Sequence, residues 1–142
     1  MCKKNSMTLK FLAKSENESF ARLAVASFCA NEKFNIEEIT DIKTAVSEAV
    51  TNSIVHAYPE NAGFININCD IFKHCVEISI QDFGIGIENV EEAMKPFFTT
   101  KPGDERSGMG FTVMEGFMDK IEVNSKRGEG TQVKFIKNIK GE

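Results

Sequence analysis

The sequence has 142 residues, of which 42% are hydrophobic and 27% are charged. These values are typical of a soluble globular chain with one core, so we treat residues 1–142 as a single domain. The formal net charge is −4 without a basic block, which argues against direct nucleic-acid binding. No apolar run could span a bilayer, and none follows Lys3 and Lys4, so we expect no membrane association, no signal peptide and a cytoplasmic location.

The N-terminal part of the chain is predicted to contain a strand followed by a helix. Thr8–Ala13 approximately alternates between polar and apolar residues, which favours an edge strand. Ser15 and Glu18 have the spacing of a capping box, so a helix is expected to start there and to stop near Asn31. The apolar face of this helix is predicted to comprise Phe20, Leu23, Ala24, Ser27 and Phe28.

A second, longer helix is predicted to begin at Asn35, a favourable N-cap residue, and to run to about His56. Pro59 cannot continue it. Small and apolar residues recur along this helix at spacings of three and four, which is typical of a helix packed on a core. These residues are Ile39, Ile42, Val46, Ala49, Val50 and Ser53.

Beyond this helix the pattern changes from helical to strand periodicity. Phe64–Ile71 and Val76–Gln81 both alternate, and the short connection between them predicts a β-hairpin. A short helix is expected over Val90–Met94, a long loop over Pro96–Met109, and a third main helix over Phe111–Met118.

Ile121–Ser125 and Thr131–Ile136 predict a second hairpin at the C-terminus. Helices on one side of a largely antiparallel sheet give an α+β fold, a two-layer sandwich. A loop as long as Pro96–Met109 is unusual in a compact domain unless it is functional or disordered, so it is interpreted as a lid. The scattered cysteines, without a C-x-x-C pair, indicate reduced thiols rather than disulfides or a zinc site.

Glu48 and Asn52 are the first candidates for chemistry. They stand four residues apart on the second helix and therefore share one side of it, next to the apolar stripe. The amide oxygen of Asn52 is a suitable ligand for Mg²⁺, and Glu48 could accept a proton from an attacking hydroxyl or water. Taken alone, such a pair is more often two solvated helix residues.

The segment from Asp82 to Gly86 follows the end of a strand and contains two glycines, which let a ligand approach the backbone closely. Asp82 could accept a hydrogen bond from an exocyclic amine such as that of adenine. A tight turn in which the aspartate only forms the turn is an equally good interpretation. Thr131 opens the last strand, and its hydroxyl could line the same cleft.

Gly108 and Gly110 lead directly into a helix, where exposed backbone amides form an anion site. Arg106 could add a fork of donors to a phosphate. Met109 stands where a P-loop requires lysine, so this segment is not a P-loop. A flexible loop before a capped helix is the alternative.

In their order along the chain, these motifs resemble those of the Bergerat-type ATP-binding fold, which histidine kinases, a class of heat-shock chaperones, type II topoisomerases and MutL-like proteins share. Four segments narrow the resemblance to the anti-sigma F factors of spore-forming bacteria, and it extends over nearly the whole chain. They are Ser15–Arg22, Ser47–Asn52, Lys95–Pro102 and Glu105–Glu115. The resemblance implies a homodimer that binds ATP or ADP with Mg²⁺, holds sporulation sigma factor F, and phosphorylates a serine of the anti-anti-sigma factor.

The resemblance also implies roles for individual residues. Glu48 would be the general base for the serine, and Asn52 would ligate Mg²⁺ in the nucleotide site. Asp82 would hold adenine, in a pocket that Gly84 and Gly86 shape.

Two further roles come from the same resemblance. Thr131 would complete the adenine side, and Arg22 on the first helix would contact the sigma factor. The phosphate lid would comprise Thr99, Thr100, Arg106, Ser107, Gly108, Met109 and Gly110.

Three alternatives compete with this interpretation. The catalytic domain of a sensor histidine kinase would need a phospho-accepting histidine on a dimerisation helix, but the two histidines are His56 in the second helix and His74 in a hairpin turn. A stress-response anti-sigma kinase would keep the chemistry and change the partners. A non-catalytic, ATP-dependent module would hold a sigma factor and transfer nothing.

Overall fold

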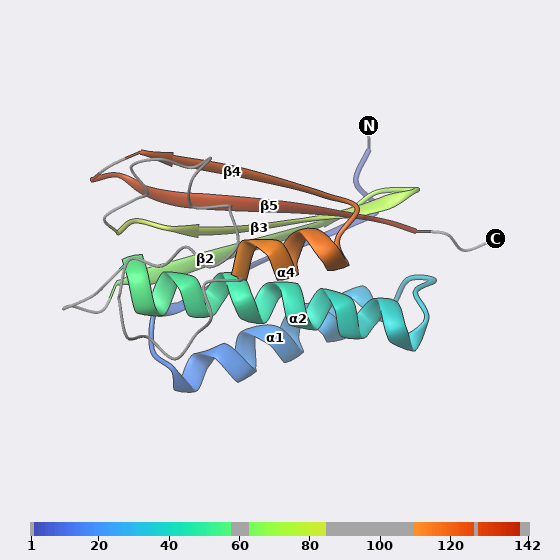
Figure 1. The fold of residues 1–142 in the computed structure, drawn as a ribbon. Helices are drawn as coiled ribbons and strands as arrows, with labels where there is room; N and C mark the ends of the chain where they lie inside the picture. The colour runs from blue at the N-terminus through green and yellow to red at the C-terminus, as the bar shows by residue number, and fades with distance from the viewer. Residues whose placement is uncertain (1, 58–62, 85–109, 127, 140–142) are drawn as a thin grey trace.

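The computed structural model describes residues 2–57, 63–84, 110–126 and 128–139. Its strands form one antiparallel sheet in the order β1-β2-β3-β5-β4, and the helices lie on one face of that sheet (Figure 1). This is the expected two-layer α+β arrangement. The elements are β1 (Asn5–Leu12), α1 (Glu16–Cys29), α2 (Ile36–Asn52), η1 (Ser53–Ala57), β2 (Phe64–Ile71), β3 (Cys75–Asp82), α4 (Gly110–Phe117), β4 (Lys120–Lys126) and β5 (Gly130–Asn138).

Both predicted hairpins and the predicted edge strand are confirmed. β1 lies at one edge of the sheet and pairs with β2, with Leu9 opposite Ile67 and Phe11 opposite Ile65. The alternation in β2 is expressed fully, because every second residue from Ile65 to Ile71 is buried under the helices. Residues of the opposite parity lie on the uncovered face of the sheet.

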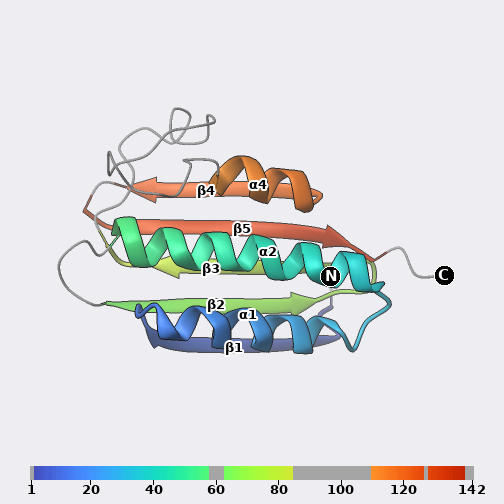
Figure 2. The same cartoon turned by 60° about the horizontal axis from the view of Figure 1, so that its bottom comes forward.

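The predicted start and apolar stripe of α2 are also confirmed. The side chain of Asn35 accepts a hydrogen bond from the Glu38 amide at 2.7 Å, and the Glu38 carboxylate accepts one from the Asn35 amide at 2.9 Å. The buried residues of α2 are Ile42, Ala45, Val46, Ala49 and Val50. The π-helical turn η1 continues α2 to Ala57, close to the expected end, and α2 lies between α1 and α4 in the helical layer (Figure 2).

The predictions for α1 are wrong in two respects. Ser15 has helical backbone angles (φ −51°, ψ −39°) and its side chain makes no capping hydrogen bond. The buried face consists of Ala21, Val25, Ala26 and Cys29, whereas Phe20 and Leu23 are each 53% exposed. Two apolar faces compete in this sequence, and the one with smaller side chains packs inward because it lets α1 approach the sheet and α2 closely.

The C-terminal elements match their prediction, with β5 extending to Asn138. Lys137 faces the helices and is only 8% exposed. Its Nζ donates to the Phe117 carbonyl at 2.6 Å and lies 3.6 Å from Asp41 Oδ2. This lysine therefore joins β5 to the end of α4 and to α2.

The four cysteines are free. Burial raises the pKa of the Cys29 thiol to about 12 and also raises that of Cys69, so both remain unreactive thiols in the core. Among the described residues, no helix combines the length and apolar character needed to cross a membrane. The predicted helix Val90–Met94 and the predicted loop Pro96–Met109 lie outside the described residues.

Candidate functional site

Asp82 is the best-defined polar group of the site. It is the last residue of β3 and is only 3% exposed. Its Oδ2 accepts a hydrogen bond from Ser53 Oγ at 2.9 Å, and its Oδ1 accepts from the amides of Gly84 at 3.1 Å and Thr131 at 3.2 Å. The carboxylate therefore joins the end of α2, the turn after β3 and the start of β5.

Burial raises the pKa of Asp82, and the three hydrogen bonds from Gly84, Ser53 and Thr131 oppose that rise. A carboxylate offers about four lone-pair positions. Among the described residues Oδ2 receives only the Ser53 hydroxyl, so it can accept a further hydrogen bond from a ligand. An amino group is the natural donor for that position.

Gly130 makes this junction possible. Its φ of 102° is favourable only for glycine, and a Cβ placed there would lie 2.2 Å from the Asp82 carbonyl oxygen. β5 thus begins in direct backbone contact with the end of β3. Sequence reasoning assigned Gly130 only to a hairpin turn and Ser53 only to the apolar stripe. Both residues support Asp82. Local sequence patterns could not predict this role, because both residues are far from Asp82 in the sequence.

Thr131 lies where the sequence placed it, beside Asp82, but its contacts differ from those expected. Its backbone amide donates a hydrogen bond to Asp82 Oδ1, and its hydroxyl lies 2.8 Å from the Ser125 hydroxyl on β4. Its side chain is therefore already engaged within the sheet. The amide of Thr131, rather than the hydroxyl, contributes to the site.

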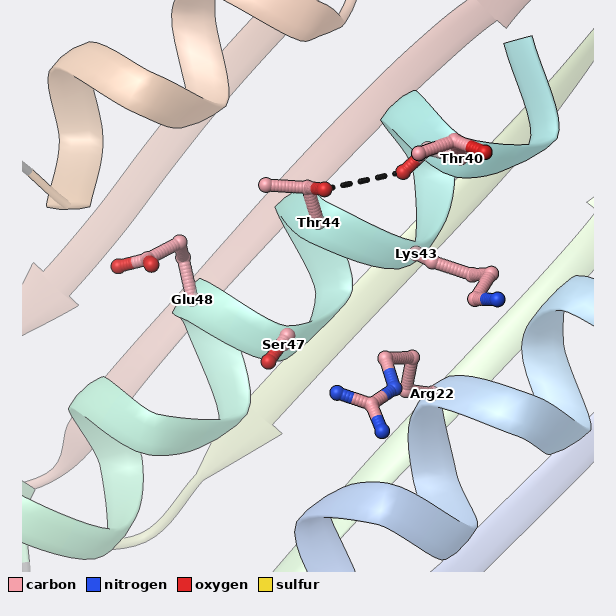
Figure 3. A pocket seen from close by; sticks show the side chains of 6 residues that line it. All are labelled: Arg22, Thr40, Lys43, Thr44, Ser47 and Glu48. Carbon is pink, nitrogen blue, oxygen red and sulfur yellow. Dashed lines mark hydrogen bonds between the residues drawn. The ribbon is translucent and has the colours of Figure 1, made fainter. Parts of the chain in front are cut away.

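Glu48 and Asn52 are both half-buried on α2, and Asn52 is its last residue. Asn52 directly precedes Ser53, whose hydroxyl donates a hydrogen bond to Asp82, so Asn52 is the chain neighbour of the Asp82 junction and Glu48 stands one turn earlier on α2. Glu48 also lines an open hollow of about 310 Å³ on the outer side of α1 and α2 (Figure 3). The hollow is lined by Arg22, Thr40, Lys43, Thr44, Ser47 and Glu48.

Arg22 projects from α1 into this hollow. Its NH1 lies 3.4 Å from Glu18 Oε2, and its NH2 donates to Ser19 Oγ at 3.2 Å. The same Glu18 oxygen accepts a hydrogen bond from Ser47 Oγ on α2. Glu18 therefore holds Arg22 in place and links it to the residue that precedes Glu48.

Gly110 begins α4 on the side of the molecule where α2 and β3 end and β5 begins (Figure 2). A helix N-terminus at this end is favourable for an anion. The other predicted glycine and lid residues lie outside the described residues. They are Gly86, Thr99, Thr100, Arg106, Ser107, Gly108 and Met109.

The protein oxygens at this end suit a metal ion that is coordinated by phosphate oxygens as well as by the protein. Among the described residues, no three His, Cys, Asp or Glu side chains gather in a way that could hold a metal ion. Mg²⁺ rarely needs such a cage, because it is usually held by one or two protein oxygens together with phosphate oxygens and waters. The single amide oxygen of Asn52 fits that mode.

Asp82→Asn should change how stability depends on pH. The folded protein holds the Asp82 proton more tightly than the unfolded chain does. The contribution of Asp82 to the free energy of unfolding therefore falls as pH rises from about 3.9 through its raised pKa. The advantage of the wild type over Asp82→Asn should fall by about 1.4 kcal/mol per pH unit within that window. Urea unfolding of both proteins between about pH 3 and pH 7 measures it. A wild-type advantage that grows with pH would contradict the expectation.

The chain is similar to known proteins in sequence and in fold. A family model described as "Histidine kinase-like ATPase domain" matches residues 11–137. The anti-sigma F factor of Clostridium novyi (strain NT) is 53% identical over 137 residues, which cover 96% of each chain. That of Clostridium acetobutylicum is 57% identical over 129 residues, covering 91% of this chain and 90% of the relative. That of Caldanaerobacter subterraneus subsp. tengcongensis is 57% identical over 135 residues, covering 95% and 94%.

A solved structure has the same fold. The crystal structure of the RsbU and RsbW domains of Rv1364c from Mycobacterium tuberculosis matches with a TM-score of 0.69 and 17% identity. The match covers 94% of this chain and 32% of that longer one. At this identity the likeness shows the fold alone; together with the family model it confirms the two-layer α+β sandwich of the Bergerat, histidine kinase-like type.

Proposed function

The chain belongs to the anti-sigma F factor family of histidine kinase-like ATPase domains, and from this we propose that it binds and inhibits sporulation sigma factor F and phosphorylates a serine of the anti-anti-sigma factor with ATP. We further propose that residues 1–142 act as one domain that binds ATP or ADP, and that the protein works as a cytoplasmic homodimer. Membership of an ATPase family supports nucleotide binding directly.

One observation carries the enzymatic part of the proposal. The hydroxyl of Ser53, which follows Asn52 in the chain, bonds the buried carboxylate of Asp82. The candidate metal ligand Asn52 is therefore the chain neighbour of a residue that holds the candidate adenine ligand, and the candidate base stands one turn earlier on α2.

Asp82 is the proposed ligand of the adenine amino group. Its carboxylate is held by donors from three elements and keeps an accepting position on Oδ2. Gly84 is part of the turn that supports it, and we propose Gly86 for the same pocket. Thr131 contributes to this side through its amide.

Asn52 is the proposed protein ligand of Mg²⁺, for the coordination reasons given above. When bound, the ion would neutralise charge on the phosphate oxygens. Gly110 at the start of α4 is proposed to bind phosphate through its backbone. The remaining members of the proposed phosphate lid are Thr99, Thr100, Arg106, Ser107, Gly108 and Met109.

Glu48 is the proposed general base. In the step, the serine oxygen of the acceptor protein bonds to the γ-phosphorus of ATP, and the bond from that phosphorus to the β,γ-bridging oxygen breaks to leave ADP. The serine proton passes to Glu48. Such transfer depends mainly on positioning and charge neutralisation, so a half-buried carboxylate beside the acceptor is sufficient as a base.

Arg22 is the proposed contact for the sigma factor. It is held by Glu18 and Ser19 on α1, a helix that also exposes Phe20 and Leu23. Arginine and exposed aromatic side chains are both typical of energetically important protein interfaces. For the homodimer, the exposed edge of β1 offers unpaired backbone groups to a second copy.

One experiment separates the main alternatives. The protein is incubated with labelled ATP, Mg²⁺ and the anti-anti-sigma factor, and sigma F retention is measured in parallel. We expect phosphoserine on the acceptor and ATP-dependent retention of sigma F. Retention without phosphoserine would leave the non-catalytic binding module. Retention of a stress-response sigma factor in place of sigma F would favour the stress-response kinase.

An Arg22→Ala arm tests the partner surface in the same experiment. Loss of the guanidinium should weaken sigma F binding by about tenfold or more, because interface arginines are often hot spots. The affinity for ATP should stay unchanged. A parallel loss of ATP affinity would instead place Arg22 in the nucleotide site.

A further inference from the structure

Helix α4 connects the proposed phosphate site with a buried cation. Gly110 lies at its N-terminal end, and at its C-terminal end the Phe117 carbonyl accepts a hydrogen bond of 2.6 Å from Lys137 Nζ. Lys137 belongs to β5, and α4 runs alongside β4 and β5 toward the end of β5 (Figure 2). Eight residues of helix span about 12 Å. Lys137 therefore lies too far from a phosphate at Gly110 to touch it, and it can act on that phosphate only through α4.

By itself α4 has little helical stability. A helix of eight residues is marginal in isolation, and Gly116 in its last turn lowers its helix propensity further. The last turn also carries Glu115, whose negative charge is unfavourable at the negative end of the helix dipole, and it contains no basic residue. The cation that stabilises this helix end comes from a different element, as Lys137 of β5.

The turn that follows α4 is fixed to the same stretch of β5. The Asp119 amide donates a hydrogen bond to the Ile136 carbonyl at 3.0 Å, and Asp119 Oδ2 accepts one from the Asn138 amide at 2.7 Å. With the bond from Lys137, three consecutive residues of β5 hold the C-terminal end of α4. Asp41 Oδ2 on α2 lies 3.6 Å from Lys137 Nζ, so α2 helps to place the ammonium group.

Stability alone is a weak explanation for a lysine at this position. Lys137 is buried, and a buried cation loses hydration that an apolar side chain of similar length would not lose. A charged hydrogen bond, in contrast, fixes the geometry of the groups that make it. Met114 in α4 and Met118 just after it are buried, but methionine is flexible and specifies position poorly. The placement of α4 on β5 therefore depends on Lys137.

We propose that Lys137, placed by Asp41, is a positioning residue for the nucleotide phosphates, because it fixes α4 so that the amides of its first turn point at them. The inference rests on the proposed nucleotide site and adds a residue outside that site which determines phosphate affinity. The three donors to the adenine ligand Asp82 come from η1, the turn after β3 and β5. Lys137 should therefore affect binding of the phosphates and leave binding of adenine unchanged.

The test compares the binding of ATP and of adenosine by Lys137→Met, which removes the charge and keeps a long, unbranched side chain. The dissociation constant for ATP should rise about tenfold. That for adenosine, which has no phosphate, should stay within about twofold of the wild type. Lys137→Arg keeps a charged donor and should bring the constant for ATP back to within about threefold of the wild type. Titrations followed by NMR measure both constants.

Lys134→Met is the matched control, since it makes the same change on the same strand. Lys134 lies on the uncovered face of the sheet, where its Nζ is 3.2 Å from Glu77 Oε1, and both constants should equal those of the wild type. Asp41→Asn keeps Lys137 and removes only its ion pair, so it should raise the constant for ATP about threefold. This variant keeps the test decisive if Lys137→Met does not fold.

Three results would overturn the proposal. One is an unchanged affinity for ATP in Lys137→Met or, if that variant does not fold, in Asp41→Asn. Another is an equal loss of affinity for ATP and adenosine, which would indicate general damage to the site. The last is an affinity for ATP in Lys137→Arg as low as that in Lys137→Met.

Amide hydrogen exchange of the protein without nucleotide separates this inference from the proposed function. The amides of α4 should exchange about tenfold faster in Lys137→Met than in the wild type, and those of α2 should stay within about twofold. If the wild type binds no ATP, the proposed nucleotide site fails, yet faster exchange confined to α4 would still support the role of Lys137 in holding this helix. Equal exchange of α4 in both proteins would overturn that role, whatever the outcome for ATP.

Discussion

Glu48→Gln is expected to lower the rate of phosphoryl transfer by about 10² to 10⁴-fold and to leave the affinity for ATP within about twofold. Glutamine keeps the size and most of the packing of the half-buried side chain but cannot accept the serine proton. The nucleotide, in our assignment, is held by Asp82 and Asn52. The effect should therefore appear in kcat, which a single-turnover assay with labelled ATP measures directly.

Glu37→Gln provides the matched control for this substitution. Glu37 is an exposed residue in the first turn of the same helix, so the same chemical change there leaves the proposed site untouched. Its transfer rate should equal that of the wild type. A parallel loss of ATP binding and transfer in Glu48→Gln would remove the assignment of Glu48 as the base.

Gly130→Ala should destabilise the protein by about 3 kcal/mol or more and weaken ATP binding. An alanine Cβ would lie 2.2 Å from the Asp82 carbonyl oxygen and 2.8 Å from the Phe83 Cα, and both of these are backbone atoms. No side-chain rotation can relieve the contact, so β5 must move away from β3. That movement would lengthen the hydrogen bond from the Thr131 amide to Asp82 Oδ1, which is now 3.2 Å.

Gly128→Ala isolates the contribution of the backbone angle alone. Gly128 also has a positive φ, 83°, but nothing lies within 4 Å of the Cβ position. Its substitution should cost only about 1 kcal/mol of strain and should not change ATP affinity. Urea unfolding and nucleotide titration of both variants measure the difference. Equal effects of the two substitutions would contradict a specific role for the β3–β5 contact.

The comparison of α1 with α2 shows where sequence reasoning was sufficient. In α2 the N-cap at Asn35 and the buried stripe were both predicted, because one face is clearly the most apolar. In α1 the predicted face was wrong, since Phe20 and Leu23 point outward and Ala21 and Val25 pack inward. Local periodicity cannot rank two apolar faces when close packing, rather than side-chain size, decides which one is buried.

The candidate site shows the same division. Local sequence was enough to identify Glu48 and Asn52 as neighbours on a helix and Asp82 as the end of a strand, because helix and strand periods act over a few residues. The tertiary structure alone brings Ser53, Gly130 and the Thr131 amide to the Asp82 carboxylate, across up to 49 residues of chain.

By itself, then, the sequence determined the elements, the two-layer class and the order of the chemical motifs, all of which depend on neighbours along the chain. Only the fold decided which face of α1 is free, which groups hold Asp82, and that Arg22 and Lys43 share a hollow with Glu48. Those outcomes depend on how closely separate elements pack, and packing is a property of the whole domain rather than of any one segment.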